Sequence, residues 1–215
     1  VFQECTSLKN ISLPDSLTSI GELTFNECTA LENINLPDSL IFIGDFAFSE
    51  CISLKSIVIP DGVTSINQGT FRSCTTLQEI VFPSNLISIK KAAFYNCTAL
   101  KNIDLPDGLT AIDEGAFLSC TALENINFPN SLTSIGEGVF GECISLKSIV
   151  LPDNLTSISE AAFAECTSLE YIQLPNHLKS IGTVAFGGCI SLKTIIIPDS
   201  VDFIGNAAFE LCTDL

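Results

Sequence analysis

The chain has 215 residues, of which 47% are apolar and 16% charged, and its formal net charge is −16. This composition is too apolar for intrinsic disorder, and the acidic balance argues against binding to nucleic acids or anionic membranes, which depends on clustered lysine and arginine. A proline, aspartate or asparagine interrupts every apolar run well short of the roughly 20 residues that a membrane-spanning helix needs.

Ten cysteines recur at a constant spacing of 23 residues, from Cys5 to Cys212. A fixed period in the range of 20–50 residues is typical of solenoids, in which short units stack and bury one continuous core between them. We therefore count coils from each cysteine, so that coil 1 starts at Cys5 and coil 9 at Cys189, and we number the columns of each coil from 1 to 23. Insertions and deletions are absent from all nine complete coils.

Each coil predicts two short strands followed by a helical segment. Columns 7 to 9 alternate apolar, polar and apolar, as a half-buried strand does, and the proline of column 10 ends the strand. Columns 13 to 16, such as Leu17–Ile20, form a second extended segment on the opposite wall. Columns 18 to 23 are rich in Ala, Glu and Gly around an invariant Phe, as in Glu160–Glu165, and we expect one or two helical turns there.

The motif L-x-x-I-x-[LIF] of columns 4 to 9 matches the core pattern of leucine-rich repeats. Its continuation through proline into x-x-[LV]-x-x-I and F-x-x-C resembles the BspA-like leucine-rich-repeat family of bacterial and protist surface proteins, as in Cys51–Pro60 and Ile112–Phe117. The resemblance covers the whole chain. It implies a curved α/β solenoid with a parallel sheet on its concave face and helical turns on its convex side. It also implies extracellular display with adhesion or host-protein binding, and it supplies no catalytic motif.

Columns 6 and 8 should point outward from the first strand and form the binding face. Val58 and Val81 predict an apolar spot, and Val150, Tyr171 and Ile196 predict a second one beside Gln173. A polar middle lies between these spots, made of Asn102, Asp104, Asn125 and Asn127. Tyrosine is enriched among interface anchors, although Val, Ile and Tyr also suit exposed strands for purely structural reasons.

Column 5 alternates in charge from coil to coil, with lysine in the odd coils and glutamate in the even coils except for Gln78. Opposite charges on neighbouring strands favour pairing, so this column predicts control of strand register rather than a ligand site. The alternation also indicates a duplicated unit of 46 residues. Sequence similarity over a longer distance supports duplication: Cys28–Leu40 resembles Cys120–Leu132, and Cys51–Ile66 resembles Cys143–Ile158.

Three other columns have a structural and a functional interpretation. The Asp and Asn residues of column 11 suit the turn after proline, and a Ca²⁺ ladder is the alternative. The cysteines should be buried thiols, with disulfides or metal ligation as alternatives. Thr and Ser dominate columns 14 and 15, where they either suit an extended strand or form a ladder that binds ice. Ile41-Phe42, Lys179 and Asp202-Phe203 interrupt that ladder, and Phe42 and Phe203 are candidate apolar contacts on the outer wall.

The sequence therefore predicts one leucine-rich-repeat domain over 1–215, a piece of a longer array because the chain begins and ends inside a coil. Its only histidine, His177, lies in a turn, and the repeat offers no second histidine and no Gly-rich phosphate loop, so we expect no enzyme activity, no cofactor and no metal. The expected function is protein binding or adhesion at the cell surface or outside the cell, without nucleic-acid binding or direct membrane insertion. The expected partner is a host protein, or a surface or matrix protein of a neighbouring cell. The alternative is a structural fibre formed by end-to-end self-association.

Overall fold

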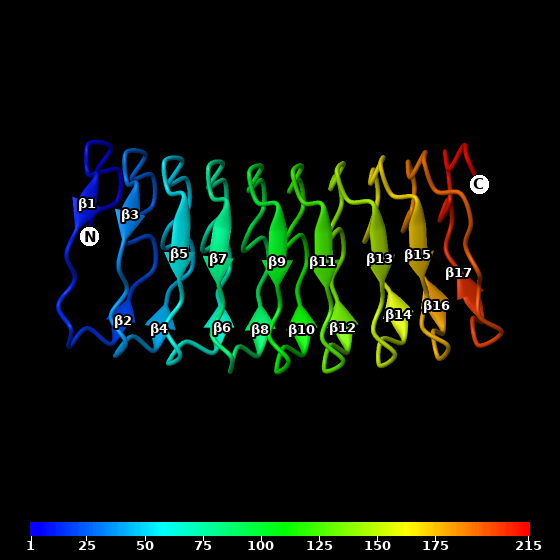
Figure 1. Cartoon of the computed structure of the whole chain (residues 1–215), viewed down its shortest axis with the longest axis horizontal. Helices are drawn as coiled ribbons and strands as arrows, with labels where there is room; N and C mark the ends of the chain where they lie inside the picture. The colour runs from blue at the N-terminus through cyan, green and yellow to red at the C-terminus, as the bar shows by residue number, and fades with distance from the viewer.

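The computed structural model describes all 215 residues as a rod of stacked coils, with the two termini at its opposite ends (Figure 1). The first wall holds the strands of columns 6 to 8: β1 (Asn10–Ile11), β3 (Asn33–Ile34), β5 (Ser56–Val58), β7 (Glu79–Val81), β9 (Asn102–Asp104), β11 (Asn125–Asn127), β13 (Ser148–Val150) and β15 (Tyr171–Gln173). The second wall holds those of columns 15 and 16: β2 (Ser19–Ile20), β4 (Phe42–Ile43), β6 (Ser65–Ile66), β8 (Ser88–Ile89), β10 (Ala111–Ile112), β12 (Ser134–Ile135), β14 (Ser157–Ile158), β16 (Ser180–Ile181) and β17 (Phe203–Ile204).

Every strand pairs in parallel with the equivalent column of a neighbouring coil, as Ile57 does with Ile80 and Ile112 with Ile135. The 23-residue period thus sets the register, and like side chains form layers inside the rod. The core is one continuous cluster of 55 buried residues. A row of ten stacked phenylalanines, from Phe2 to Phe209, runs along the rod, with neighbouring ring centroids 5.1–5.7 Å apart. Its eight inner rings belong to the buried cluster, and the two end rings pack against it.

The third side of the rod, which we call the turn wall, is formed by columns 18 to 23 and contains no helix. The helical turns expected there, as in Glu160–Glu165, are wrong. Columns 19 and 23 have positive φ in every coil, for example 51° at Ala161 and 58° at Glu165, and this left-handed backbone cannot continue a right-handed helix. Every second N–H group instead donates a hydrogen bond to a carbonyl of the next coil, as when Phe163 N–H donates to the carbonyl of Ala185 at 2.8 Å.

This left-handed backbone predicts unequal costs for two glycine substitutions. Gly138, in column 19, has a φ of 57° and no atom within 4 Å of the position that a Cβ would take. Gly138→Ala should therefore lower the free energy of unfolding by about 1 kcal/mol through backbone strain alone. The control is Gly108→Ala, at a position with ordinary φ and only normal van der Waals contacts, which should be neutral or slightly stabilising. Urea unfolding of both variants checks this; equal effects would contradict it.

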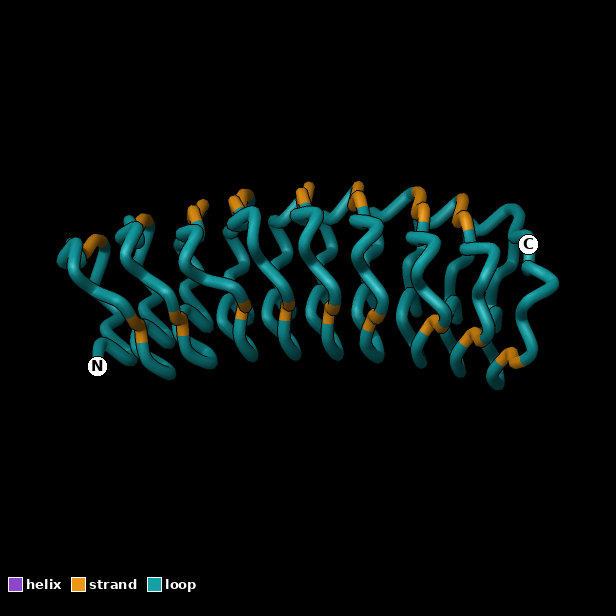
Figure 2. The backbone as a smooth tube through the Cα atoms, turned by 90° about the horizontal axis from the view of Figure 1, so that it is seen from below, coloured by secondary structure: helices purple, strands orange, loops and turns teal.

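The rod is bowed, and the first wall lies on the outer side of the bow (Figure 2). The expectation that this sheet lines a concave face is therefore wrong. The hydrogen-bond pattern gives the reason: first-wall strands are joined only in pairs, β1 with β3, β5 with β7, β9 with β11 and β13 with β15. On the second wall the ladder runs unbroken through β6, β8, β10 and β12. The more fully bonded wall holds its coils closer together and lies inside.

Two coil boundaries lack a backbone ladder on both walls, namely the boundary between coils 2 and 3 and that between coils 6 and 7. Here the column-17 side chain takes the place of the usual backbone donor. The amide Nδ2 of Asn67 donates to the carbonyl of Ile43 at 2.6 Å, and the hydroxyl of Ser159 donates to that of Ile135 at 2.7 Å. The turn wall continues across both boundaries, as when Phe48 N–H donates to the carbonyl of Thr70. We call these two boundaries the open joints.

Candidate functional site

The candidate site is the exposed face of the first wall, where columns 6 and 8 point to solvent. Strand alternation explains this, because Ile57 and Ile59 turn inward and are buried while Ser56 and Val58 turn outward. All ten side chains expected on this face are exposed. The proline that follows each strand ends it before the chain turns toward the second wall.

Strand register brings the predicted side chains together in three groups. Val58 lies opposite Val81 on β5 and β7. The polar middle is a quartet on β9 and β11, with Asn102 opposite Asn125 and Asp104 opposite Asn127.

The third group is looser than the sequence suggested. Val150 lies opposite Gln173, and Tyr171 pairs with Thr194 through a single bridge. Ile196 belongs to no strand and is 82% exposed. Gln173 separates Val150 from Ile196 along column 8, so these two apolar residues do not form one continuous spot.

Shallow grooves cross this face between neighbouring coils. One of about 440 Å³ lies between coils 4 and 5, lined by Glu79, Val81, Lys101, Asn102 and Asp104 among others. Another of about 290 Å³ lies between coils 8 and 9, lined by Tyr171, Gln173, Thr194 and Ile196 among others. These grooves could not be predicted from the sequence, because the proline and apolar columns are the same at every boundary.

Column 5 borders the face and supplies its charge. Lys55 and Glu32 approach to 3.9 Å, and Lys193 and Glu170 to 2.5 Å, in both cases across a boundary without a first-wall ladder. This contact with Lys193 lowers the pKa of the exposed Glu170 carboxyl and raises that of the lysine. Columns 5, 6 and 8 together hold five lysines and five carboxylates, so the whole net charge of −16 lies on other surfaces.

The cysteine column offers no reactive thiol in the middle of the rod. All ten cysteines are free, and nine of them donate their S–H to the carbonyl of the column-21 phenylalanine that lies 26 residues earlier in the chain, at 3.1–3.3 Å. Burial raises the pKa of Cys74 and of Cys120 to about 12. A thiol rather than a thiolate therefore occupies these positions, and the thiolate is the nucleophile and metal ligand.

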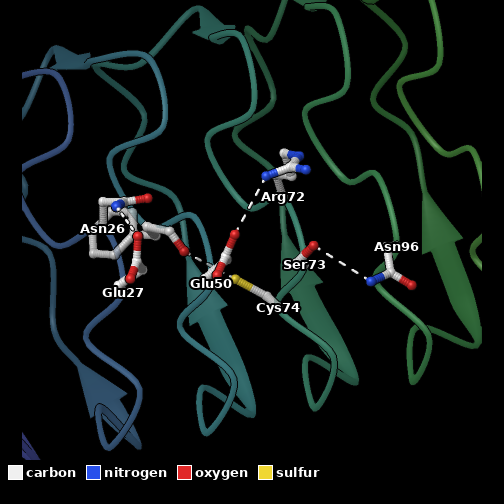
Figure 3. A network of polar contacts seen from close by, with 8 residues as sticks. Asn26, Glu27, Glu50, Arg72, Ser73, Cys74 and Asn96 are labelled. Atoms are coloured by element: carbon white, nitrogen blue, oxygen red, sulfur yellow. Dashed lines mark hydrogen bonds and ion pairs between the residues drawn. The ribbon is translucent and has the colours of Figure 1, made fainter. Parts of the chain in front are cut away.

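The turn wall carries a separate polar network (Figure 3). Arg72 contacts Glu50 at 3.4 Å and lies over the ring of Tyr95, and the amide of Asn96 donates to the hydroxyl of Ser73. No group of three or more His, Cys, Asp or Glu side chains is placed to hold a metal ion, including the aspartates of column 11. The structure contains no helical segment with the length and hydrophobicity of a membrane span.

Comparisons with known proteins agree with this architecture. A family model described as a BspA type leucine rich repeat region matches residues 1–106 and 87–215. The chain is similar to a leucine-rich repeat protein from Bacteroides ovatus, with 29% identity, a TM-score of 0.64 and coverage of 100% of this chain and 73% of that one. It is also similar to the leucine-rich repeat protein TpLRR of T. pallidum, with 28% identity, a TM-score of 0.69 and coverage of 86% and 78%.

A third solved structure is described as a leucine rich cell surface protein from Faecalibacterium prausnitzii. It has 29% identity, a TM-score of 0.55 and coverage of 100% of this chain and 73% of that one. No curated protein sequence matches the chain.

Proposed function

The chain belongs to the BspA-type leucine-rich-repeat family, and from this premise we propose that it is a non-enzymatic module that binds a protein partner at the cell surface. The first wall is the surface that makes the contact. The repeat family is generally non-enzymatic, and a rod of stacked coils offers a long regular surface rather than a closed catalytic pocket.

The observation that supports this choice of surface is the distribution of charge. The first wall is balanced in charge and carries exposed Val58, Val81, Val150, Tyr171 and Ile196. The remaining surfaces carry the whole excess of carboxylates. Interface centres are depleted in charge and enriched in aromatic and apolar side chains, and the first wall combines charge balance with such side chains from coil 3 to coil 9.

Recognition there would depend on shape and hydrogen bonding. The quartet of Asn102, Asp104, Asn125 and Asn127 presents amide donors and carbonyl and carboxylate acceptors in fixed register. Apolar groups lie on both sides of it along the rod. The partner best suited to this pattern is a protein that presents polar main-chain or side-chain groups between two apolar contacts.

Display at the cell surface is supported by the relative from Faecalibacterium prausnitzii, which is described as a cell surface protein. A host protein or a matrix protein is the partner class that fits such a location. The proposal includes no nucleic acid, membrane insertion or cofactor.

The double substitution Val150→Asp with Tyr171→Asp should abolish binding through the first wall. Both side chains are exposed, so the variant should fold, while a buried carboxylate at an apolar contact would oppose association. We expect a loss of about 2 kcal/mol or more in binding free energy, as for interface hot spots. Biolayer interferometry against a panel of purified matrix and serum proteins measures it.

The matched control is Thr133→Asp with Thr156→Asp, which adds the same two charges to exposed positions on the second wall. Binding that is lost in both variants, or in neither, would contradict the proposal. Light scattering at increasing concentration tests the structural alternative, since a fibre-forming chain would grow in mass whereas a binding module would remain monodisperse.

A further inference from the structure

The second wall carries an uncharged strip that the first-wall function does not use. Columns 14 and 15 hold no charged residue in coils 1 to 7, and the strip begins to include charges only at Lys179 and Asp202. The strip runs from Thr18-Ser19 in coil 1 to Thr156-Ser157 in coil 7, and it consists of Thr, Ser and Ala except for Ile41, Phe42 and Ile87. The second wall lies on the inner side of the bow, so the strip runs along the concave side of the rod (Figure 2).

Three large apolar side chains stand exposed at one end of this strip. Ile41 is 61% exposed, Phe42 49% and Ile87 52%. Ile41 in coil 2 and Ile87 in coil 4 occupy the same column, with Thr64 between them, so they lie about 10 Å apart at the usual strand spacing. We call Ile41, Phe42 and Ile87 the apolar patch.

The fold does not require the apolar patch. Coils 3 and 6 form the same short strand with Thr64-Ser65 and Thr133-Ser134 in these columns. Large apolar groups exposed side by side where the repeat accepts hydroxyls are typical of an interaction surface.

Carboxylates border the patch on both sides. Asp15, Asp38 and Asp61 precede it in column 11, and Glu22 and Asp45 follow it in column 18; all five are exposed. The segments from column 10 to column 18 of coils 1 to 3 contain no lysine or arginine.

The two lysines that follow the second-wall strand of coil 4 are paired with carboxylates of coil 5. In coil 4, Lys90 contacts Asp113 at 3.6 Å and Lys91 contacts Glu114 at 2.8 Å. The border therefore presents an unbalanced negative field around an apolar centre.

We propose that the apolar patch and its acidic border form a second docking surface, for a cationic amphipathic peptide segment of a partner protein. Apolar side chains of the segment cover Ile41, Phe42 and Ile87, and its lysines or arginines lie over the carboxylates. Charge complementarity selects this partner, because an acidic or neutral segment would leave the border unpaired. The surface is on a different wall from the first-wall site, so the two can be occupied together.

A synthetic Leu/Lys amphipathic peptide that carries one tryptophan is a direct probe, with a Leu/Glu peptide of the same pattern as its counterpart. Fluorescence anisotropy at 150 mM salt should show binding of the Leu/Lys peptide only. The triple substitution Ile41→Thr, Phe42→Ser and Ile87→Thr should weaken that binding at least tenfold. Each new residue is one that the same column holds in other coils, and thermal unfolding followed by circular dichroism verifies that the variant is folded.

A second variant tests the border without touching the patch. Asp38→Asn and Asp45→Gln introduce the residues that other coils hold in these columns, Asn130 and Gln68. They should weaken binding severalfold and reduce its dependence on salt.

The matched control is Val81→Thr with Val150→Thr, which removes exposed apolar groups from the first wall and should leave peptide binding unchanged. Unchanged binding in the triple variant would overturn the proposal, because it would mean that the peptide is attracted by net charge alone. Equal binding of the Leu/Glu peptide would overturn the charge selection. Neither result bears on the first-wall function, which the substitutions at Val150 and Tyr171 test.

Discussion

Raising the pH from 8 to 11 should unfold the protein cooperatively, because the fold holds the column-1 thiols protonated. Burial raises the pKa of Cys74, of Cys120 and of Cys189 to about 12, from an ordinary value of 9.0. Between these values the folded state binds more protons than the unfolded state, so stability falls as the pH rises. The contribution of these thiols is fully present below pH 9.

The magnitude of this loss is large for a protein of this size. Each pH unit above the unfolded-state pKa lowers the free energy of unfolding by about 1.4 kcal/mol per thiol, so each of these three thiols should lower it by on the order of 3 kcal/mol at pH 11. The total is comparable with the whole stability of about 5–15 kcal/mol that is usual for a folded domain. Urea unfolding at pH 7.5 and at pH 10.5, followed by circular dichroism, measures the difference.

The control is Cys120→Ser, which keeps a donor for the carbonyl of Phe94 but does not titrate in this range. Its stability should depend less on pH than that of the parent chain, by on the order of 2 kcal/mol between the two conditions. Identical pH dependence in the two proteins would show that the buried thiols are not the cause.

The substitution Phe117→Ala should have the largest effect of any single change in the core. Phe117 is fully buried, and its ring stacks on Phe94 at 5.1 Å and on Phe140 at 5.4 Å, nearly parallel to both. Truncation leaves a cavity in the middle of the phenylalanine row, and such changes cost about 3–5 kcal/mol. Because each coil contacts only its neighbours, the variant should also unfold less cooperatively, as two separately stabilised halves.

Phe203→Ala removes the same atoms from a side chain that is more than half exposed, and it should cost less than about 1 kcal/mol. Guanidinium unfolding of both variants measures the free energy of unfolding and its dependence on denaturant concentration, which reports the cooperativity of the transition. A loss of less than about 1 kcal/mol for Phe117→Ala would show that the row can close over the missing ring.

The repeat period was sufficient to predict the coils, the buried columns and the parallel register. Invariant Leu, Ile and Phe can form layers only if equivalent columns stack, and every observed strand pair joins equivalent columns. The outward direction of columns 6 and 8 followed from strand alternation in the same way. These features depend on sequence periodicity, which is directly visible.

The backbone of the turn wall could not be predicted from composition. Ala161 and Glu165 have high helix propensity, yet both adopt positive φ because their N–H groups are needed by the next coil. A signal was present in the glycines: Gly69, Gly115 and Gly138 share column 19, which is left-handed in every coil. Hydrogen bonds between coils outweighed local propensity.

The direction of the bow depends on small differences between otherwise equal boundaries. Resemblance to leucine-rich repeats implied a concave first wall, whereas the interrupted ladder there places it outside. The sequence similarity of coils 2–3 to coils 6–7 did indicate that the boundary between coils 2 and 3 resembles that between coils 6 and 7. It did not show that these two would lack a ladder, which depends on the side-chain bonds of Asn67 and Ser159.

The two open joints have a mechanical consequence. If the rod is pulled from its ends, the load at these joints falls on the hydrogen bonds of the turn wall and on a few side chains. Rupture should therefore begin there and divide the rod into blocks of two, four and three coils. The middle block, residues 51–142, would then extend by about 300 Å at roughly 3.5 Å per residue. A rod that lengthens in such steps would absorb the work of a shear force, while the remaining blocks stayed folded.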